Sequence, residues 1–280
     1  MQKLTVTRQP GLSVSDTRRD SNGLPESLRQ SAAKPMTASH AMHLRRLFRP
    51  ALCLCIAIFL PAPIEAQDSA ASERVRATES GVFSVFSGNR QVGTEKFKIT
   101  RTATGLEAEG EIQLEPPGGP AVSESTLLRL DAKMQPTFYE RRQSSPHKGI
   151  LTAQFGPSET KLVVSMDSGT DDSIYYLPSN NLAVLDTNFF HHYSILLRQF
   201  DASRSEPQPF HVFVPQEALP GTVSLQTKGK EKQTVGNQTL DLNHFQVVSE
   251  ELTIDLWATD EGEIQRISIP PANLEILRQR

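Results

Sequence analysis

Lys-Phe-Lys-Ile-Thr at residues 96–100 alternates polar and apolar side chains, and this pattern decides the fold class. Successive side chains of an extended strand point to opposite faces, so Phe97 and Ile99 share one face while Lys96 and Lys98 share the other. Such a strand has one buried and one solvated face. The alternation recurs at Leu162, Val164 and Met166, at Phe210, Val212 and Val214, at Leu240 and Leu242, at Leu252, Ile254 and Leu256, and at Ile267 and Ile269.

Residues that tolerate tight turns separate these segments. They are Ser87-Gly88-Asn89, Ala103-Thr104-Gly105, Pro116-Pro117-Gly118-Gly119-Pro120, Val235-Gly236-Asn237 and Asp260-Glu261-Gly262. The pattern predicts about ten or eleven strands at a spacing of roughly 10–15 residues, which is typical of antiparallel hairpins. The sequence has no internal repeat, and this argues against a propeller or a solenoid.

One segment departs from the strand pattern and predicts a helix. It starts at Asp186, an expected N-cap, and places an apolar face at Phe189, Tyr193, Leu196, Leu197 and Phe200. A single helix has to bury such a face on the sheet, and the sheet then curves around it. We therefore predict a mainly β fold: a curved antiparallel sheet, as a half-barrel or open barrel, with one helix packed on the concave side.

A signal peptide is predicted at residues 42–66. Arg45 and Arg46 precede an apolar run of about 10 residues, and small or apolar residues lead to a cleavage site near Ala66. The run is shorter than the roughly 20 apolar residues that a transmembrane helix needs. We expect general secretory export to the periplasm or the extracellular space, with twin-arginine export as the alternative.

The signal peptide divides the chain. We predict that residues 1–41 are a disordered leader or follow from a start codon placed too early, and that residues 67–79 form a linker. Residues 80–280 are expected to form a single antiparallel β domain. Both cysteines, Cys53 and Cys55, lie within the signal peptide, so the mature domain is expected to have no thiol and no disulfide.

The charge of the expected mature chain is acidic. Residues 67–280 contain 20 Lys and Arg against 28 Asp and Glu, a net charge of −8. An acidic domain disfavours binding to nucleic acid or to anionic membrane surfaces through charge. The mature chain also has no apolar run long enough to span a bilayer, so we expect no transmembrane segment in it.

Motifs for catalysis or cofactor binding are absent from the sequence. It has no Gly-x-Ser-x-Gly elbow, no phosphate-binding Gly-x-x-x-x-Gly-Lys loop, no Gly-x-Gly-x-x-Gly turn and no His-Glu-x-x-His pair. We predict that the protein is not an enzyme and that it has no cofactor and no metal ligands.

His191 and His192 carry the alternative hypothesis of an envelope hydrolase or a metal-dependent enzyme, together with Asp186. Adjacent residues on a helix point about 100° apart, so both rings cannot easily face one ion. A metal site would need His211 or His244 from a distant strand. The simpler expectation places His191 on the solvated face of the helix and His192 at its margin.

The aromatic helix also predicts a ligand site. If the helix and the curved sheet enclose an apolar groove, Phe189, Phe190, Tyr193 and Leu197 would bind the ligand, with Phe190 and Tyr193 at the mouth. The competing interpretation is that the same side chains are simply core.

The ends of the domain carry a resemblance. Gly-Val-Phe-Ser-Val-Phe at residues 81–86, the Gly-x-x-x-Val-Gly-Thr-Glu hairpin at 88–95 and Leu-Trp-Ala-Thr-Asp-Glu-Gly at 256–262 resemble exported bacterial β-rich domains of unknown function. Those domains in turn resemble lipoprotein carriers of the LolA/LolB type. The resemblance implies a half-barrel with a concave face that could hold acyl chains. It transfers no ligand or catalytic residue to this chain.

The predicted function is that of an exported periplasmic binding or scaffolding domain. Its expected partner is a lipid or another apolar small molecule, or another envelope protein, and not nucleic acid. The enzyme that uses His191 or His192 is one alternative. The other is a structural interaction module that pairs its exposed strand edges with a protein partner.

Overall fold

The computed structural model describes residues 77–279. The predicted leader, the signal peptide and most of the predicted linker lie outside these residues. The first strand begins at Ala77, so residues 77–79, which we predicted to belong to the linker, are part of the sheet.

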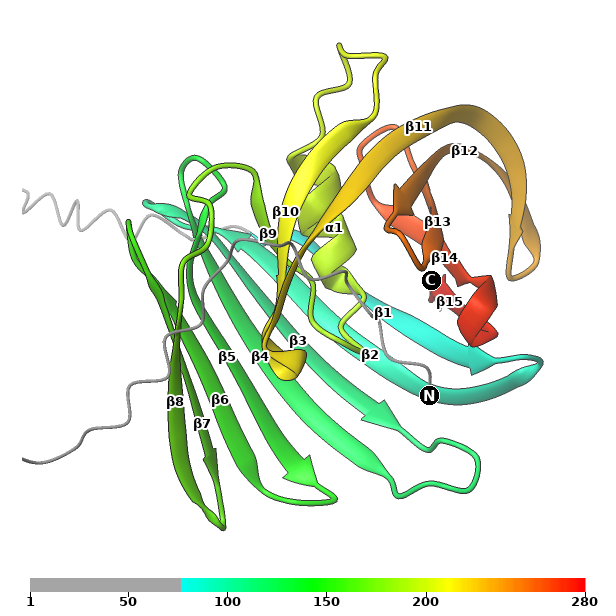
Figure 1. Cartoon of the computed structure of the whole chain (residues 1–280). Helices are drawn as coiled ribbons and strands as arrows, with labels where there is room; N and C mark the ends of the chain where they lie inside the picture. Colours follow the sequence, from blue (N-terminus) through cyan, green and yellow to red (C-terminus); the bar gives the residue numbers. More distant parts are fainter. Residues whose placement is uncertain (1–76, 280) are drawn as a thin grey trace, which may run out of the picture. The chain divides into compact units, whose positions relative to one another are not determined.

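The described chain is mainly β, and the prediction of a curved sheet with one helix on its concave side is confirmed (Figure 1). Its elements are β1 (Ala77–Ser87), β2 (Arg90–Arg101), β3 (Gly105–Leu114), β4 (Val122–Asp131), β5 (Pro136–Ser145), β6 (Gly149–Phe155), β7 (Thr160–Met166), β8 (Gly169–Tyr175), β9 (Leu182–Val184), α1 (His191–Arg198), β10 (Gln208–Val214), the 3-10 turn η1 (Pro215–Glu217), β11 (Leu219–Val235), β12 (Gln238–Val248), β13 (Thr253–Ala258), β14 (Ile264–Ile269), the 3-10 turn η2 (Pro270–Ala272) and β15 (Leu274–Arg278).

All fifteen strands form one open sheet in the order β8-β7-β6-β5-β4-β3-β2-β1-β15-β14-β13-β12-β11-β10-β9. Two meanders, β1–β8 and β10–β15, join where β1 pairs with β15. Among the strands of residues 77–279, only β9 and β10 run parallel. The expected number of strands was therefore too low. β9 is three buried residues with no alternation, and strands such as β7 and β8, which flank Asp167-Ser168, are closer together in the sequence than the expected spacing.

The buried faces of most strands follow the alternation that the sequence showed. Met166 departs from it because it is exposed, and Leu240 and Leu242 belong to a small separate cluster with Val235 and Trp257. In β2, Phe97 and Ile99 are buried while Lys96 and Lys98 are exposed, and β3 alternates in the same way along its length. The inward residues of both meanders belong to one hydrophobic core, which also includes the side chains of α1.

The helix is shorter than predicted and begins later. Asp186 is not its N-cap: α1 begins at His191, after Phe190, which makes no side-chain cap bond. Asn188 has a positive φ of 73°, which interrupts the helical path, and the Asp186 carboxylate bonds other partners. No helix within residues 77–279 is both long and apolar enough to cross a membrane.

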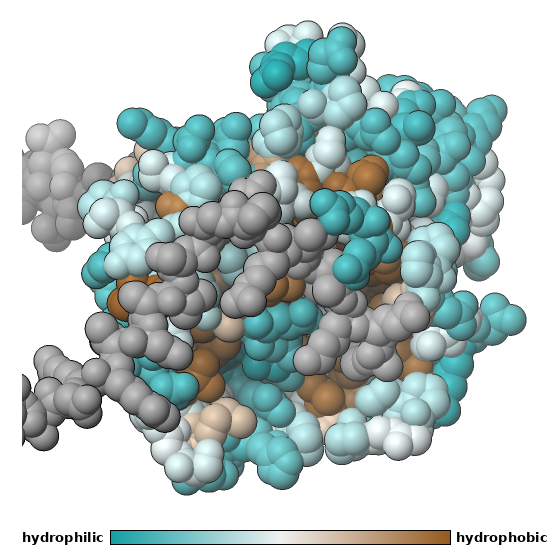
Figure 2. All heavy atoms as spheres, viewed as in Figure 1, coloured by the Kyte–Doolittle hydropathy of each residue, from teal (hydrophilic) through white to brown (hydrophobic). Residues whose placement is uncertain are grey.

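The surface in Figure 2 is mostly hydrophilic, with hydrophobic residues in separate patches. In the described part of the chain the large hydrophobic side chains that are exposed are Ile150, Met166 and Tyr176. Isolated apolar residues of this kind are normal on protein surfaces.

Candidate functional site: the interior around the helix

The four residues predicted to bind a ligand lie inside the domain. Phe189, Phe190 and Tyr193 are buried in the main core, and Leu197 packs against it while partly exposed. The expectation that Phe190 and Tyr193 stand at the mouth of an open groove is wrong, because each is only 5% exposed. The sheet surrounds the segment that carries them. Whether they bind a ligand is untested by this geometry and stays a prediction.

One side of α1 faces an apolar wall, which we define as Val223, Phe245, Val247 and Ile254 on β11, β12 and β13. Tyr193 shares a small cavity of about 10 Å³ with Val223, Val247 and Ile254. A cavity of that size holds one water molecule at most. Just beyond the C-terminal end of α1, Phe200 contacts Phe245 edge to face with ring centroids 5.4 Å apart. The apolar face predicted from the sequence is therefore packed on this side, although Leu197 and Phe200 remain partly exposed.

The opposite side of α1 faces a polar wall, which we define as Glu95 on β2, Thr126 on β4 and Tyr139 on β5. Glu95 is fully buried and accepts two hydrogen bonds from the start of the helix. Its Oε1 lies 2.5 Å from Nδ1 of His191, and its Oε2 accepts the backbone N–H of Phe190 at 2.9 Å. Because a carboxylate only accepts, this geometry places a proton on Nδ1 of His191.

His191 contradicts the expectation of a solvated face, since its side chain is 0% exposed. Its ring lies over Gly110 of β3, where a Cβ atom would stand only 2.5 Å from its Cε1. It also stacks on Phe97 with ring centroids 5.9 Å apart. His192, expected at the margin, is fully buried as well. The sheet curves far enough to cover both sides of the helix, which helical periodicity alone does not show.

Asp186 forms hydrogen bonds with three elements, β5, η1 and α1. Its Oδ2 accepts the hydroxyl proton of Tyr139 on β5, and its Oδ1 accepts the backbone N–H of Gln216 in η1 at 3.0 Å. Its own backbone N–H donates to Nδ1 of His192 at 3.1 Å. His192 therefore carries its ring proton on Nε2, the opposite tautomer to His191.

Burial is the largest cause of the pKa shifts of Asp186, Tyr139 and His192. It raises the pKa of Asp186 to about 6, against the lowering effect of the Tyr139 hydrogen bond. Burial, together with the negative charge of Asp186, raises the pKa of Tyr139 well above its usual value. Burial also lowers the pKa of His192 well below its usual value, and the neighbouring His191 adds to this. The charged forms of all three groups are disfavoured inside the domain.

Other buried ions of the interior are paired. Arg141 forms a two-point contact with Glu124, with Nε to Oε2 at 3.0 Å and Nη2 to Oε1 at 2.5 Å. Glu79 on β1 bonds Arg198 and Arg278, both at 2.7 Å, and so ties the end of α1 to the sheet. A paired and hydrogen-bonded ion is the arrangement in which burial of charge is tolerated.

Four buried polar atoms of the interface lack a hydrogen-bond partner among residues 77–279: Thr126 Oγ1, His191 Nε2, His192 Nε2 and Ser194 Oγ. Three of them belong to α1 and one to the polar wall. Native proteins leave few such atoms unpaired, and polar sites of this kind take up water or a ligand. The contact between α1 and the polar wall therefore leaves some hydrogen-bonding atoms without a partner from the described residues.

The Glu95–His191 pair has the form that enzymes use to orient a general base. A substrate would have to reach His191 Nε2, which is buried. Asp186 and His192 do adjoin, as the enzyme hypothesis requires, but both Asp186 oxygens hold other partners. Within residues 77–279 no three His, Cys, Asp or Glu side chains gather as potential metal ligands.

The polar wall was not predicted from the sequence. Glu95 has the same parity as Phe97 and Ile99, so the alternation that identified β2 also points Glu95 inward. Arg141 stands two residues after the buried Tyr139 in the same way. A charged residue at an inward position of a strand was the available signal.

Comparison with known proteins gives similar folds only. No protein-family model matches the sequence, and no curated protein matches it. A β-barrel-like protein of the domain of unknown function DUF1849 from Brucella abortus is similar in structure, with 7% identity and a TM-score of 0.48 over 73% of this chain and 97% of that one. A DUF1089 family protein from Pseudomonas aeruginosa has 9% identity and a TM-score of 0.39 over 61% and 86%. Neither likeness assigns a ligand or an activity to this chain.

Proposed function

We propose that this protein is an exported, non-enzymatic binding domain that takes a lipid or another apolar molecule into the interior around α1. The observation that carries the proposal is that the aromatic residues of this segment face an apolar wall inside a curved sheet. Apolar and aromatic side chains of this kind line small-molecule sites. The cavity beside Tyr193 is only about 10 Å³, so uptake requires a ligand to displace side chains of α1.

The state of the polar wall supports a helix that can move. Unpaired buried polar groups are costly, so a helix that carries them is held less tightly than one whose polar groups are all bonded. Here His191 Nε2, His192 Nε2 and Ser194 Oγ have no partner among the described residues. Displacing α1 would hydrate these groups, and this offsets part of the apolar contact that is lost.

The pairing of acids and bases supports a role without catalysis. Both oxygens of Glu95 and both oxygens of Asp186 are engaged within the protein. The general base of the Glu95–His191 pair would be Nε2 of His191, and this atom is buried away from any substrate.

Native mass spectrometry combined with lipid extraction tests the proposal, with the whole chain expressed under its own N-terminal segment. We expect a bound acyl species on the wild type that is lost from the double variant Phe190→Ala/Tyr193→Ala. Phe83→Ala is the matched control, because Phe83 is an equally buried core aromatic on β1 that stacks on Phe97. It should lose stability but keep the ligand.

A bare wild type contradicts the proposal, as does equal loss of ligand and folding in both variants, which would make Phe190 and Tyr193 plain core. Stoichiometric zinc in the same spectrum would favour the metal-dependent enzyme. The same preparation also reports the cleavage site near Ala66.

A structural interaction module is the second candidate, and the open edge of the sheet favours it. In the described sheet β8 pairs with β7 on one side only, and its first residues are exposed. A free strand edge can add a strand from a partner. Crosslinking followed by co-purification of one specific envelope protein would favour this function over ligand binding.

A further inference from the structure

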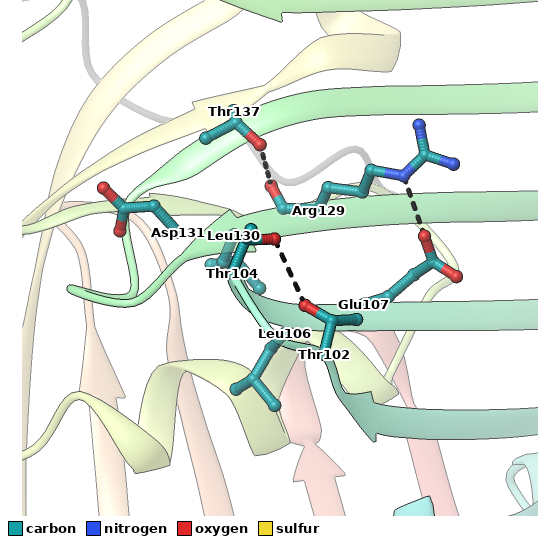
Figure 3. Close-up of a pocket in the computed structure, with 8 residues that line it drawn as sticks. All are labelled: Thr102, Thr104, Leu106, Glu107, Arg129, Leu130, Asp131 and Thr137. Atoms are coloured by element: carbon teal, nitrogen blue, oxygen red, sulfur yellow. Dashed lines mark hydrogen bonds and ion pairs between the residues drawn. The ribbon is translucent and has the colours of Figure 1, made fainter. Parts of the chain in front are cut away.

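A second hollow lies at the rim of the sheet, away from α1. It has a volume of about 210 Å³ and forms where the turn between β2 and β3 meets the ends of β4 and β5 (Figure 3). Drug-sized ligands occupy pockets of about 300–1,000 Å³, so this one fits a single small ring. The role proposed for the interior does not use it.

The walls of the hollow are held in place by backbone contacts. A Cβ atom at Gly105 would lie 2.0 Å from the carbonyl oxygen of Leu130, so only glycine lets this turn approach β4 so closely. On the other wall, Oδ1 of Asp131 accepts the N–H of Lys133 at 2.8 Å and of Gln135 at 2.9 Å, which fixes the turn before β5. A pocket on rigid elements loses little entropy when it binds.

The polar lining offers both donors and acceptors. Arg129 uses Nε to bond Oε2 of Glu107 at 2.7 Å, which leaves its terminal N–H groups and Oε1 of Glu107 for a ligand. The hydroxyls of Thr102 and Thr104 lie 3.4 Å apart, and the Thr137 hydroxyl donates to the backbone oxygen of Arg129. In Figure 3 the threonine pair stands between Asp131 at one end and the Arg129 guanidinium at the other.

The charges of the lining disfavour a simple ion. An anion in the hollow would meet Glu107 and Asp131, and a cation would meet Arg129. A hydroxyl can donate and accept at once, so a ligand rich in hydroxyls satisfies both kinds of group. Leu106 and Leu130 also line the hollow, but they are only 6% and 4% exposed, so the ligand would meet mainly the side chains of the other lining residues.

We propose that this rim pocket binds one ring of a neutral sugar, either a free monosaccharide or the terminal unit of a larger glycan. Arg129 and Glu107 bond adjacent hydroxyls of the ring, and the threonines bond the others. The pocket is independent of the interior site, so either proposal can fail without the other.

The test uses ligand-detected NMR on the full chain with neutral monosaccharides, their methyl glycosides and short oligosaccharides. A small alkylammonium ion and a small carboxylate serve as charged probes. We expect saturable binding of at least one neutral sugar in preference to both ions. Binding of oligosaccharides alone identifies a terminal glycan unit, and binding of the monosaccharide identifies the free sugar.

Matched variants locate the binding. Arg129→Gln and Glu107→Gln should each weaken it at least about tenfold, since hydrogen bonds to charged groups are lost. Arg142→Gln and Glu140→Gln are the controls, because that pair has the same 2.7 Å contact and a similarly exposed arginine outside the pocket. Exposed ion pairs add little to stability, so all four variants should fold. The proposal is overturned if no neutral sugar binds saturably, if a charged probe binds better, or if both variant pairs behave alike.

Discussion

The two sides of α1 are buried by different means. On one side Tyr193 packs against the apolar wall, where little free space remains. On the other side His191 and the Phe190 backbone bond Glu95 of the polar wall. Apolar contact gives stability in proportion to the area removed from water. A buried hydrogen bond contributes little net stability, but removing one partner leaves the other buried and unpaired, which costs more. The comparison indicates that the apolar wall stabilises the helix and the polar wall fixes its position.

The largest effect should come from removing the carboxylate of the polar wall. Glu95→Ala leaves His191 Nδ1–H and the Phe190 N–H buried without their acceptor. Each unsatisfied donor costs about 1–3 kcal/mol, so the unfolding free energy should fall by about 2–6 kcal/mol. Urea denaturation of the variant and the wild type measures the difference. A change below about 1 kcal/mol would mean that the pair is not buried as described.

A double variant sharpens this result. Glu95→Leu/His191→Leu replaces both partners by apolar groups, and such replacements are often neutral or stabilising. It should recover most of the stability lost in Glu95→Ala, apart from the unpaired Phe190 N–H. If the double variant is as unstable as the single one, packing rather than charge pairing dominates on this side.

A slightly smaller loss is expected on the apolar wall. Ile254 is buried beside Tyr193, and Ile254→Ala should cost about 3 kcal/mol because it deletes apolar contact and leaves a cavity. Urea denaturation gives the value. In contrast to the polar wall, no second substitution on α1 should restore the unfolding free energy lost in Ile254→Ala. If His191→Leu restored it, the two walls would not act independently.

The sequence predicted the sheet and the helix but not how they meet. Alternation such as that of Phe97 and Ile99 shows which face of a strand is buried, and this was sufficient for the fold class. Helical spacing showed only the apolar face of α1, so His191 was expected in solvent. That the opposite face is covered depends on the curvature of the whole sheet, which no local pattern reports. Glu95, at an inward position, was visible in the sequence but not used.

Asp186, which accepts the hydroxyl proton of Tyr139 in the polar wall, predicts a dependence of stability on pH. The pKa of its carboxyl is about 6 in the folded protein, above the ordinary 3.8, so its protonated form is favoured by folding. The contribution of this carboxyl to the unfolding free energy is fully present below pH 3.8. It is lost as the pH rises through 6, by up to about 3 kcal/mol. The lowered pKa of His192 acts in the opposite direction, with stability lost as the pH falls below 6.5.

Asp186→Asn separates these two effects. The amide keeps an acceptor for Gln216 and cannot ionise, so only the His192 dependence remains. The difference in unfolding free energy between wild type and variant should shift in favour of the wild type as the pH falls from 7 to 4. Denaturation across this range measures it, and a difference that is independent of pH would contradict the burial of the carboxyl.

The smallest effect is expected at Gly110 of β3, where the sheet touches the His191 ring of α1. Gly110→Ala places a Cβ 2.5 Å from Cε1 and 2.8 Å from Nδ1 of His191, so the ring has to shift. Overpacking of this kind costs about 1–3 kcal/mol. The cost should fall when His191 is also replaced by alanine, and thermal unfolding of the single and double variants tests this coupling.

The histidine tautomers test the burial of both sides of α1 most directly. A long-range proton–nitrogen NMR spectrum of the full chain with labelled histidine assigns the protonated nitrogen in each ring. The structure predicts opposite tautomers, with Nδ1–H in His191 beside Glu95 and Nε2–H in His192 beside the Asp186 backbone, and Glu95→Ala should change only the first. If both rings instead show the averaged signals of histidines in solvent, α1 does not rest on the polar wall.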